Sequence, residues 1–199
     1  MQKPAITQVP IHDIIANRWS PRAYDANKPV TEMQITTMLE AARWAPSCFG
    51  DQPWRFLVWN KNQDQVTWQH ALEIIVPNNQ VWAKNAPVFI LVCAHGLFGH
   101  NQKPNRWAEY DAGAAAENLC LQASALGLVA HQMGGFEADA ARLKFNIPEV
   151  VTPMAMLAIG YEGDTKDLPE DLKLRELAPR ARKPLGEVFF NGVWDKPII

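Results

Sequence analysis

The 199-residue chain lacks the features that mark several classes of protein. Its formal net charge of −2 gives no general attraction to polyanions, so nucleic acid is not expected as a partner. No apolar run approaches the ~18 residues needed to span a bilayer. The first seven residues have no apolar core of the kind found in secretion signals. We therefore expect a cytoplasmic protein that does not associate with membranes.

Cysteine and histidine are also scarce, with three and five residues respectively. Cys48, Cys93 and Cys120 cannot all pair and have no metal-ligand spacing. Two of them, Cys93 and Cys120, lie in apolar stretches where buried thiols are expected, whereas Cys48 lies in a loop. The histidines are scattered, without metal-ligand spacing or a Ser-His-Asp or Cys-His signature. The sequence therefore indicates neither a metal site nor a protein nucleophile.

The composition, 48% hydrophobic and 20% charged, is that of one globular domain spanning residues 1–199. Thr31 and Gln34 form a capping-box pattern at the start of a helix that Pro46 should end, and Gly127 is a typical helix C-cap. Apolar periodicity predicts helices near 11–17, 31–44, 64–75, 107–126 and 137–145, and strands near 55–59, 88–94, 128–132 and 154–161. This is an α+β pattern, and the strand at 88–94 is expected to be buried on both faces.

Two segments suggest contact with another chain. The helix near 107–126 contains Gly113 followed by three alanines, so another backbone could approach it closely. The C-terminal arm, about 174–199, mixes cations and prolines with the apolar stretch 188–190 and reads as extended. An extended arm needs a surface to lie on, and we expect the other subunit of a homodimer to provide it.

Two clusters of cations could bind phosphate. Arg18, Trp19, Ser20 and Arg22 follow the first helix and offer two guanidinium groups and a hydroxyl. Near the other end of the chain, a second cluster contains Arg180, Arg182 and Lys183. Both clusters could instead be solvated surface groups. They could bind one phosphate only if the fold brings the ends of the chain together.

Two further segments could line a flat ligand. The loop from Ala45 to Trp54 is restricted by two prolines and contains Pro46, Ser47, Cys48 and Gly50. The segment Gln132, Met133, Gly134, Gly135 follows a predicted strand, and its glycines would let main-chain amides approach a ligand. It has no G-x-G-x-x-G pattern, so a Rossmann site is not indicated. An ordinary loop and a plain turn are the alternatives.

Taken in order, these segments resemble the nitroreductase family from about Ile11 to the carboxyl terminus. The resemblance is carried by Arg-x-Ser-x-Arg, Ala-Pro-Ser with Gln-Pro-Trp, Asp-x-Gly-Ala-Ala, Gly-Gly-Phe and a late Arg/Lys-Pro-Leu. It implies an α+β, three-layer α-β-α fold with a central mixed sheet, and a homodimer with FMN in two interface pockets. It also implies NADH or NADPH as the donor of a hydride that passes to a small organic acceptor.

The resemblance also implies roles for individual residues. Arg18 and Ser20 would meet the FMN phosphate together with Arg182 and Arg180 or Lys183. Arg22 would lie towards the pyrimidine edge of the flavin and stabilise negative charge that develops there. The remaining implied contacts are Trp19 and Pro46 beside these segments, Ser47 and Cys48 from the partner chain, and Gln132, Met133, Gly134 and Gly135 near the reactive nitrogen.

The resemblance leaves the roles of some residues, and the exact function, undecided. The family often has asparagine where this chain has Gly50, so Asp51 or a main-chain group would have to replace it, and no flavin contact is transferred to residues 78–84. Phe49, Trp107 and Phe136 could select the acceptor or simply pack. A flavin-binding store or sensor with little turnover, and a dimeric interaction module without cofactor, are the alternatives to a ping-pong enzyme.

Overall fold

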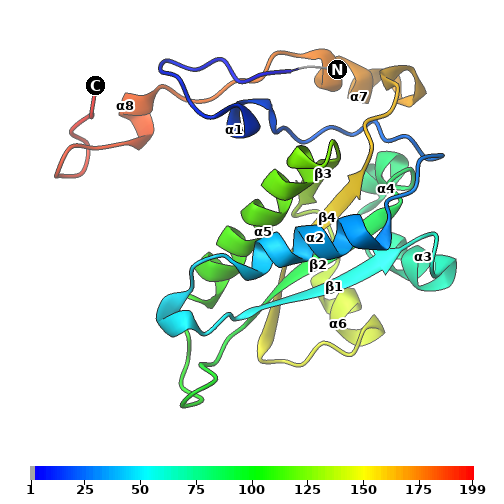
Figure 1. Ribbon diagram of the computed structural model, residues 1–199, viewed down its shortest axis with the longest axis horizontal. Coiled ribbons are helices and arrows are strands. Elements are labelled where there is room, and N and C mark those ends of the chain that lie inside the picture. Colours follow the sequence, from blue (N-terminus) through cyan, green and yellow to red (C-terminus); the bar gives the residue numbers. More distant parts are fainter. Residues whose placement is uncertain (1–2) are drawn as a thin grey trace.

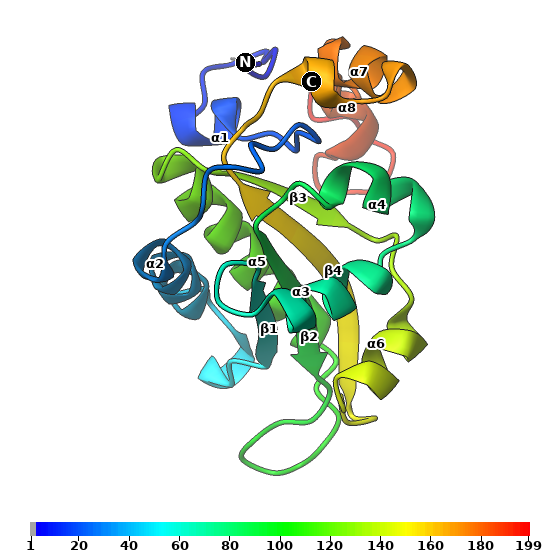
Figure 2. The same ribbon diagram turned by 90° about the vertical axis from the view of Figure 1, so that its right-hand side faces the viewer.

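The computed structural model describes residues 3–199 and contains four strands and several helices arranged in three layers (Figures 1 and 2). The strands are β1 Trp54–Asn60, β2 Val88–His95, β3 Val129–Met133 and β4 Val151–Gly160. The α-helices are α1 Asp13–Asn17, α2 Glu32–Arg43, α3 Gln65–Glu73, α4 Pro77–Ala83, α5 Ala108–Ala125, α6 Ala138–Lys144, α7 Glu170–Leu177 and α8 Leu185–Val188. Short 3-10 turns occupy Cys48–Gly50 and Thr165–Asp167.

The sheet has the order β1-β2-β4-β3, and each pair of neighbours is antiparallel. The expected mixed sheet is therefore wrong for the described residues. Both β2 and β3 run antiparallel to β4, so they run parallel to each other, and α5 connects them. They do not pair because β4, the last strand in the sequence, lies between them.

Strand β2 is the centre of the hydrophobic core, as its apolar run predicts. Val88, Ile90 and Val92 point to one face of the sheet and pack with buried residues of α2 and α5. Phe89 and Leu91 point to the opposite face and pack with buried residues of α3, α4 and α6. Figure 2 shows these two groups of helices on opposite sides of the sheet. The three-layer α-β-α arrangement and the α+β class are confirmed.

Local signals placed the helix ends correctly. Thr31 and Gln34 form the capping box: the Thr31 hydroxyl accepts from the Gln34 N–H at 3.2 Å, and the Gln34 side chain accepts from the Thr31 N–H at 3.0 Å. Gly127 follows the C-cap of α5 with a φ of +72°, a conformation that glycine adopts without strain. These local signals specify the start of α2 and the end of α5, the two helices that cover one face of the sheet.

Two parts of the secondary structure differ from expectation. Helix α4 was not predicted, because Pro77–Ala83 is short and its first turn is polar. The arm at 174–199 is not extended throughout: residues up to Leu177 belong to α7, and α8 follows further on. Figure 1 shows this arm running back across one end of the molecule beside the N-terminal segment.

A close approach near the end of β4 fixes the path of the chain after α1. Tyr24 forms an isolated bridge with Glu162, and the N–H of Gly163 donates to the carbonyl of Ala23 at 2.9 Å. A Cβ atom on Gly163 would lie 2.4 Å from the carbonyl carbon of Tyr24, so only glycine permits this contact. The segment that contains Arg18 to Arg22 is thereby held over one end of the sheet.

Candidate functional site

The segment after α1 presents the first cationic cluster. Arg18 is the C-cap residue of α1, and its guanidinium lies 3.3 Å from the Ser20 hydroxyl and 3.5 Å from the Glu117 carboxylate. Its side chain is only 17% exposed. Trp19 lies beside it and packs under the ammonium group of Lys3, which is 4.7 Å from the ring centroid. Arg18 and Ser20 are therefore preorganised together.

The second cationic cluster meets the first, because the two ends of the chain lie side by side. The guanidinium of Arg180 donates to the carbonyls of Ala16 at 2.7 Å and Lys3 at 2.9 Å. Burial lowers the pKa of Arg180, and the nearby cations Arg18 and Arg182 lower it further. The fold therefore brings the two ends of the chain together, as binding of one phosphate by both clusters requires, and it gathers like charges at one place on the surface.

The other two cations of the second cluster are less constrained. The guanidinium of Arg182 donates to the carbonyl of Ala181 at 2.8 Å, and its side chain is exposed. Lys183 is exposed as well. Both side chains are therefore accessible to an anion at the surface.

Arg22 is held by a residue that sequence reasoning missed. The carboxylate of Glu176 in α7 accepts from the N–H groups of Arg22 at 2.6 Å and Ala23 at 3.2 Å. Its other oxygen lies 3.6 Å from the Arg22 guanidinium. Glu176 is 1% exposed, whereas Leu174 and Leu177 of the same helix face solvent. A helix pattern normally predicts the reverse, so no sequence signal would have identified Glu176.

His131 in β3 supports the same segment from below. Its ring packs 4.6 Å from that of Trp82, and its Nδ1 lies 2.9 Å from the carbonyl oxygen of Pro21. A carbonyl only accepts, so Nδ1 carries the proton and donates. Burial lowers the pKa of His131 to about 4, and the cations Arg22 and Arg18 add to the effect. His131 is therefore a neutral support for the chain between the two arginines.

The segment at the end of β3 continues from His131 and has two unlike glycines. The side chain of Gln132 lies 3.5 Å from the Cys120 thiol and is exposed, whereas Met133 is buried. A Cβ on Gly134 would meet nothing within 4 Å, but a Cβ on Gly135 would meet the Asn79 side chain at 2.7 Å. Gly134 is thus open to a ligand, while Gly135 is needed for packing against α4.

The loop that contains Ser47 and Cys48 lies apart from these residues. The N–H of Cys48 donates to the buried carboxylate of Asp111 at 2.9 Å, which fixes the loop near the start of α5. Arg18 lies further along this 18-residue helix: it is paired with Glu117 in the middle of the helix and lines a surface depression together with Ser124 near the C-terminal end. Within one chain, the loop with Ser47 and Cys48 is therefore separated from the segment that contains Arg18.

The remaining loop positions have local roles. Pro46 is exposed, and the Ser47 hydroxyl accepts from the Gln52 N–H at 3.1 Å. Gly50 has a φ of +66°, a conformation that glycine adopts without strain. Asp51 accepts from the Gly99 N–H at 2.8 Å, so its carboxylate is engaged with the following loop.

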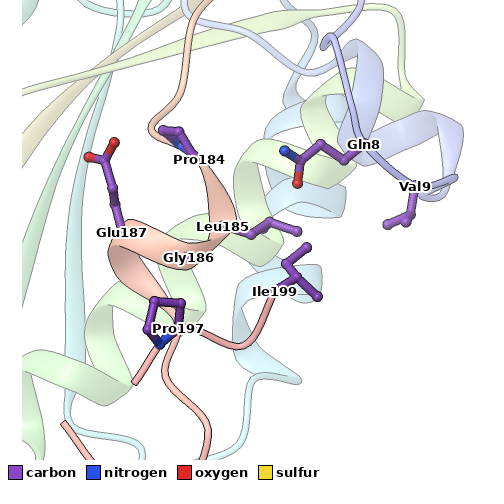
Figure 3. Close-up of a pocket in the computed structure, with 8 residues that line it drawn as sticks. All are labelled: Gln8, Val9, Pro184, Leu185, Gly186, Glu187, Pro197 and Ile199. Atoms are coloured by element: carbon purple, nitrogen blue, oxygen red, sulfur yellow. The ribbon is translucent and has the colours of Figure 1, made fainter. Parts of the chain in front are cut away.

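Depressions on the surface do not coincide with one complete site. One of about 520 Å³ lies between the N-terminal segment and α8, where Leu185 and Ile199 face Gln8 and Val9 (Figure 3). It contains no candidate cofactor residue. Another, of about 330 Å³, includes Arg18 and Trp19 but none of the other candidates.

Burial of the cysteines agrees with their positions in the sequence. Burial raises the pKa of Cys93 to about 11 and that of Cys120 to about 12, and both thiols are enclosed as expected. Among residues 3–199, no group of three or more His, Cys, Asp or Glu side chains could hold a metal ion. In the same range, none of the helices has the length and apolar character to cross a membrane.

Comparison with known proteins identifies the fold family. The model of the nitroreductase family matches residues 15–81 and 60–161, most of the chain. The chain belongs to the nitroreductase family. This confirms the resemblance that rested on the ordered motifs, and the family match covers the Arg18, Ser47 and Gly134 segments.

Relatives of this nitroreductase-family chain are similar over most of their length. A solved structure described as an oxidoreductase containing FMN is 38% identical, with a TM-score of 0.89 and 96% of each chain covered. Protein DrgA of Synechocystis is 30% identical, over 92% of this chain and 96% of its own. A Methanothermobacter thermautotrophicus protein, named as a candidate NADH dehydrogenase or NAD(P)H nitroreductase, is 29% identical over 82% and 84%.

The neutral state of His131 predicts a dependence of stability on pH. Its pKa is about 4 in the folded chain, against an ordinary value of 6.5, so the unfolded chain binds more protons between these pH values. The stabilisation is therefore complete above pH 6.5 and is lost as the pH falls towards 4, by at most about 3 kcal/mol. Urea unfolding of the apoprotein across this range measures the change.

The comparison uses His131→Gln and, as a matched control, His100→Gln at an exposed ring. We expect the first variant to flatten the pH dependence and the second to leave it intact. An unaltered slope in His131→Gln would mean that other groups cause the effect.

Proposed function

We propose that the protein is an FMN-dependent oxidoreductase that transfers hydride from NADH or NADPH to a small organic acceptor. The meeting of the two cationic clusters, Arg18 with Ser20 and Arg180 with Arg182, carries this proposal. The FMN-containing relative with 38% identity supports the choice of cofactor.

The residues at this place fit a phosphate group. Burial lowers the pKa of Arg180, and repulsion by Arg18 and Arg182 lowers it further. A dianion placed among these three groups would offset the repulsion. Ser20 adds a hydroxyl donor without bulk, next to Arg18. Arg18, Ser20, Arg180 and Arg182 would therefore hold the phosphate, with Lys183 at the margin.

The flavin ring would extend from this phosphate site towards the end of β3. Arg22 would face the pyrimidine edge, and the open Gly134 would present its main chain near the reactive nitrogen. When bound, FMN supplies the hydride chemistry, and the protein supplies position, charge and exclusion of water. Gln132 is exposed beside this path, while Met133 and Gly135 support it from within.

The opposite face of the ring would be covered by a second subunit. Cys48 is bound to Asp111 near the start of α5, whereas Arg18 is paired with Glu117 further along the helix. We therefore expect Ser47 and Cys48 to reach the flavin of the partner rather than their own. Exposed apolar side chains also need cover, since Phe189 and Trp194 of the arm are 54% and 81% exposed. We infer a homodimer in which residues 174–199 embrace the partner and each interface holds one FMN.

Donor and acceptor would use the same flat face of the ring in turn, which gives ping-pong kinetics. Phe49, 82% exposed and held at a φ of +56°, stacks edge-on against Phe98 at 5.8 Å. Trp107 is partly exposed beside Phe98, at 6.1 Å. These rings, rather than the half-buried Phe136, are best placed to contact an aromatic or quinone acceptor.

The phosphate assignment predicts a difference between FMN and riboflavin, which lacks the phosphate. Removing one charge-assisted contact in Arg18→Ala should weaken FMN binding by roughly 10- to 100-fold. Riboflavin binding should change by less than about threefold, because it makes no use of Arg18. Titration calorimetry or fluorescence quenching of both flavins measures the two affinities.

The control for that experiment is Arg43→Ala, at an exposed arginine paired with Glu40 within α2. It should leave both affinities as in the unaltered protein. Equal losses of FMN and riboflavin affinity in Arg18→Ala would contradict a phosphate contact, and no binding of either flavin by the unaltered protein would refute the proposed function.

The dimer assignment predicts an effect of a large charged side chain on α5. Gly113 is exposed, and a Cβ there would meet nothing within 4 Å in one chain. Arginine is a good helix former, so Gly113→Arg should leave the subunit folded. An unpaired charge at the interface should weaken association at least about 30-fold. Light scattering with size-exclusion chromatography measures the mass.

Leu143→Arg is the matched control, because Leu143 is 82% exposed on α6, on the other face of the sheet. It should leave the dimer intact. Were Gly113→Arg to remain as dimeric as the control, α5 could not form the interface.

A further inference from the structure

Glu176 is an unusual residue to find in the interior. It is 1% exposed and comes from α7, 154 positions after Arg22 in the chain. Burial of a carboxylate is unfavourable unless charge and hydrogen bonds offset it. The residues around Glu176 therefore indicate which charged group its carboxylate stabilises.

Among residues 3–199, the hydrogen-bond and ion-pair partners of the Glu176 side chain are Arg22 and its neighbour Ala23. Oε1 accepts from the main-chain N–H groups of Arg22 and Ala23. Within residues 3–199, Oε2 has no hydrogen-bond partner, and its ion pair is with the Arg22 guanidinium at 3.6 Å. Glu176 thus fixes the backbone at Arg22 and places a negative charge beside its positive charge.

The ion pair leaves the Arg22 guanidinium available to a ligand. A guanidinium has five N–H donors, and at 3.6 Å the carboxylate attracts it without a close hydrogen bond. The Arg22 side chain is 27% exposed, so part of it faces outward while Glu176 stays enclosed. The same carboxylate also affects Tyr24. Burial raises the pKa of Tyr24 well above its ordinary value, and the negative charge of Glu176 raises it further.

We propose that Glu176 is a positioning residue whose negative charge partly offsets the positive charge that Arg22 presents to FMN. It thereby lowers the reduction potential of the bound flavin. The inference rests on the proposed function, in which Arg22 faces the pyrimidine edge. Two-electron reduction moves a hydride from NAD(P)H to the flavin, leaving NAD(P)⁺ and adding one negative charge to the flavin. Arg22 favours that charge, and Glu176 opposes it.

The test is the midpoint potential of bound FMN, measured by anaerobic titration against a reference dye at pH 8, where carboxylates ordinarily carry their charge. In Glu176→Gln the amide oxygen still accepts from the two N–H groups, but the negative charge is gone. Reduced FMN should bind about tenfold more tightly relative to oxidised FMN, a positive shift of ~30 mV for a two-electron couple.

Two further variants test the order in which the midpoint potentials must fall. Arg22→Ala should move the potential in the negative direction, and the double variant Arg22→Ala/Glu176→Gln should lie above Arg22→Ala and near the unaltered protein. The exposed Glu187 of α8 provides the control Glu187→Gln, which removes the same charge and should change the affinity ratio by less than about twofold.

Each outcome separates the inference from the proposed function. If the unaltered protein binds no FMN, the proposed function fails. If every variant binds FMN but Glu176→Gln shifts the potential by no more than Glu187→Gln, or in the negative direction, the inference alone is overturned. Should Glu176→Gln not fold, the double variant, which removes the buried pair as a unit, is compared with Arg22→Ala and must show the positive shift.

Discussion

The candidate site depends on a buried carboxylate that joins the two ends of the chain. Glu176 accepts from the N–H groups of Arg22 and Ala23, and so binds the C-terminal helix α7 to the segment after α1. Because Glu176 has no access to water, its partners cannot leave without exposing an uncompensated charge to the protein interior. The path of the N-terminal segment is thereby coupled to that of the arm.

That connection places the two cationic clusters together. Arg180 follows Glu176 by four residues and binds the carbonyls of Lys3 and Ala16, which brings its guanidinium beside Arg18. His131, neutral and half-buried, supports the intervening turn from the sheet. Arg18 is already paired with Glu117, and a phosphate at this point would offset the repulsion that remains among Arg18, Arg180 and Arg182.

Much of the fold could be predicted because it follows from local patterns. The capping box at Thr31, the glycine after α5 and the apolar run of β2 each specify their element directly. The central position of β4 could not be predicted, since strand order depends on long-range pairing that leaves no local signal. Helix α4 is held by tertiary contacts of Trp82 and Ala83 rather than by its own sequence.

In the candidate site, too, some residues could be predicted from the sequence and others could not. Arg18, Ser20 and the glycines could be chosen because they occur in motifs with a defined order. Glu176 could not, because an acidic residue in EDLKLREL normally faces solvent, and only the fold shows that it points inward. The loop with Ser47 and Cys48 is bound to the start of α5, whereas Arg18 is paired with Glu117 further along that helix, so the proposed role of the loop depends on an interface that one chain does not contain.

If the joined ends of this chain bind a redox-active FMN, the absorbance spectrum of the purified protein reports both the cofactor and its redox state. We expect a flavin spectrum, with FMN as the released cofactor, and loss of the absorbance when NADH or NADPH is added without oxygen. A colourless protein that takes up no added FMN would refute FMN binding at this site. A bound flavin that neither nucleotide reduces would instead indicate a store or sensor.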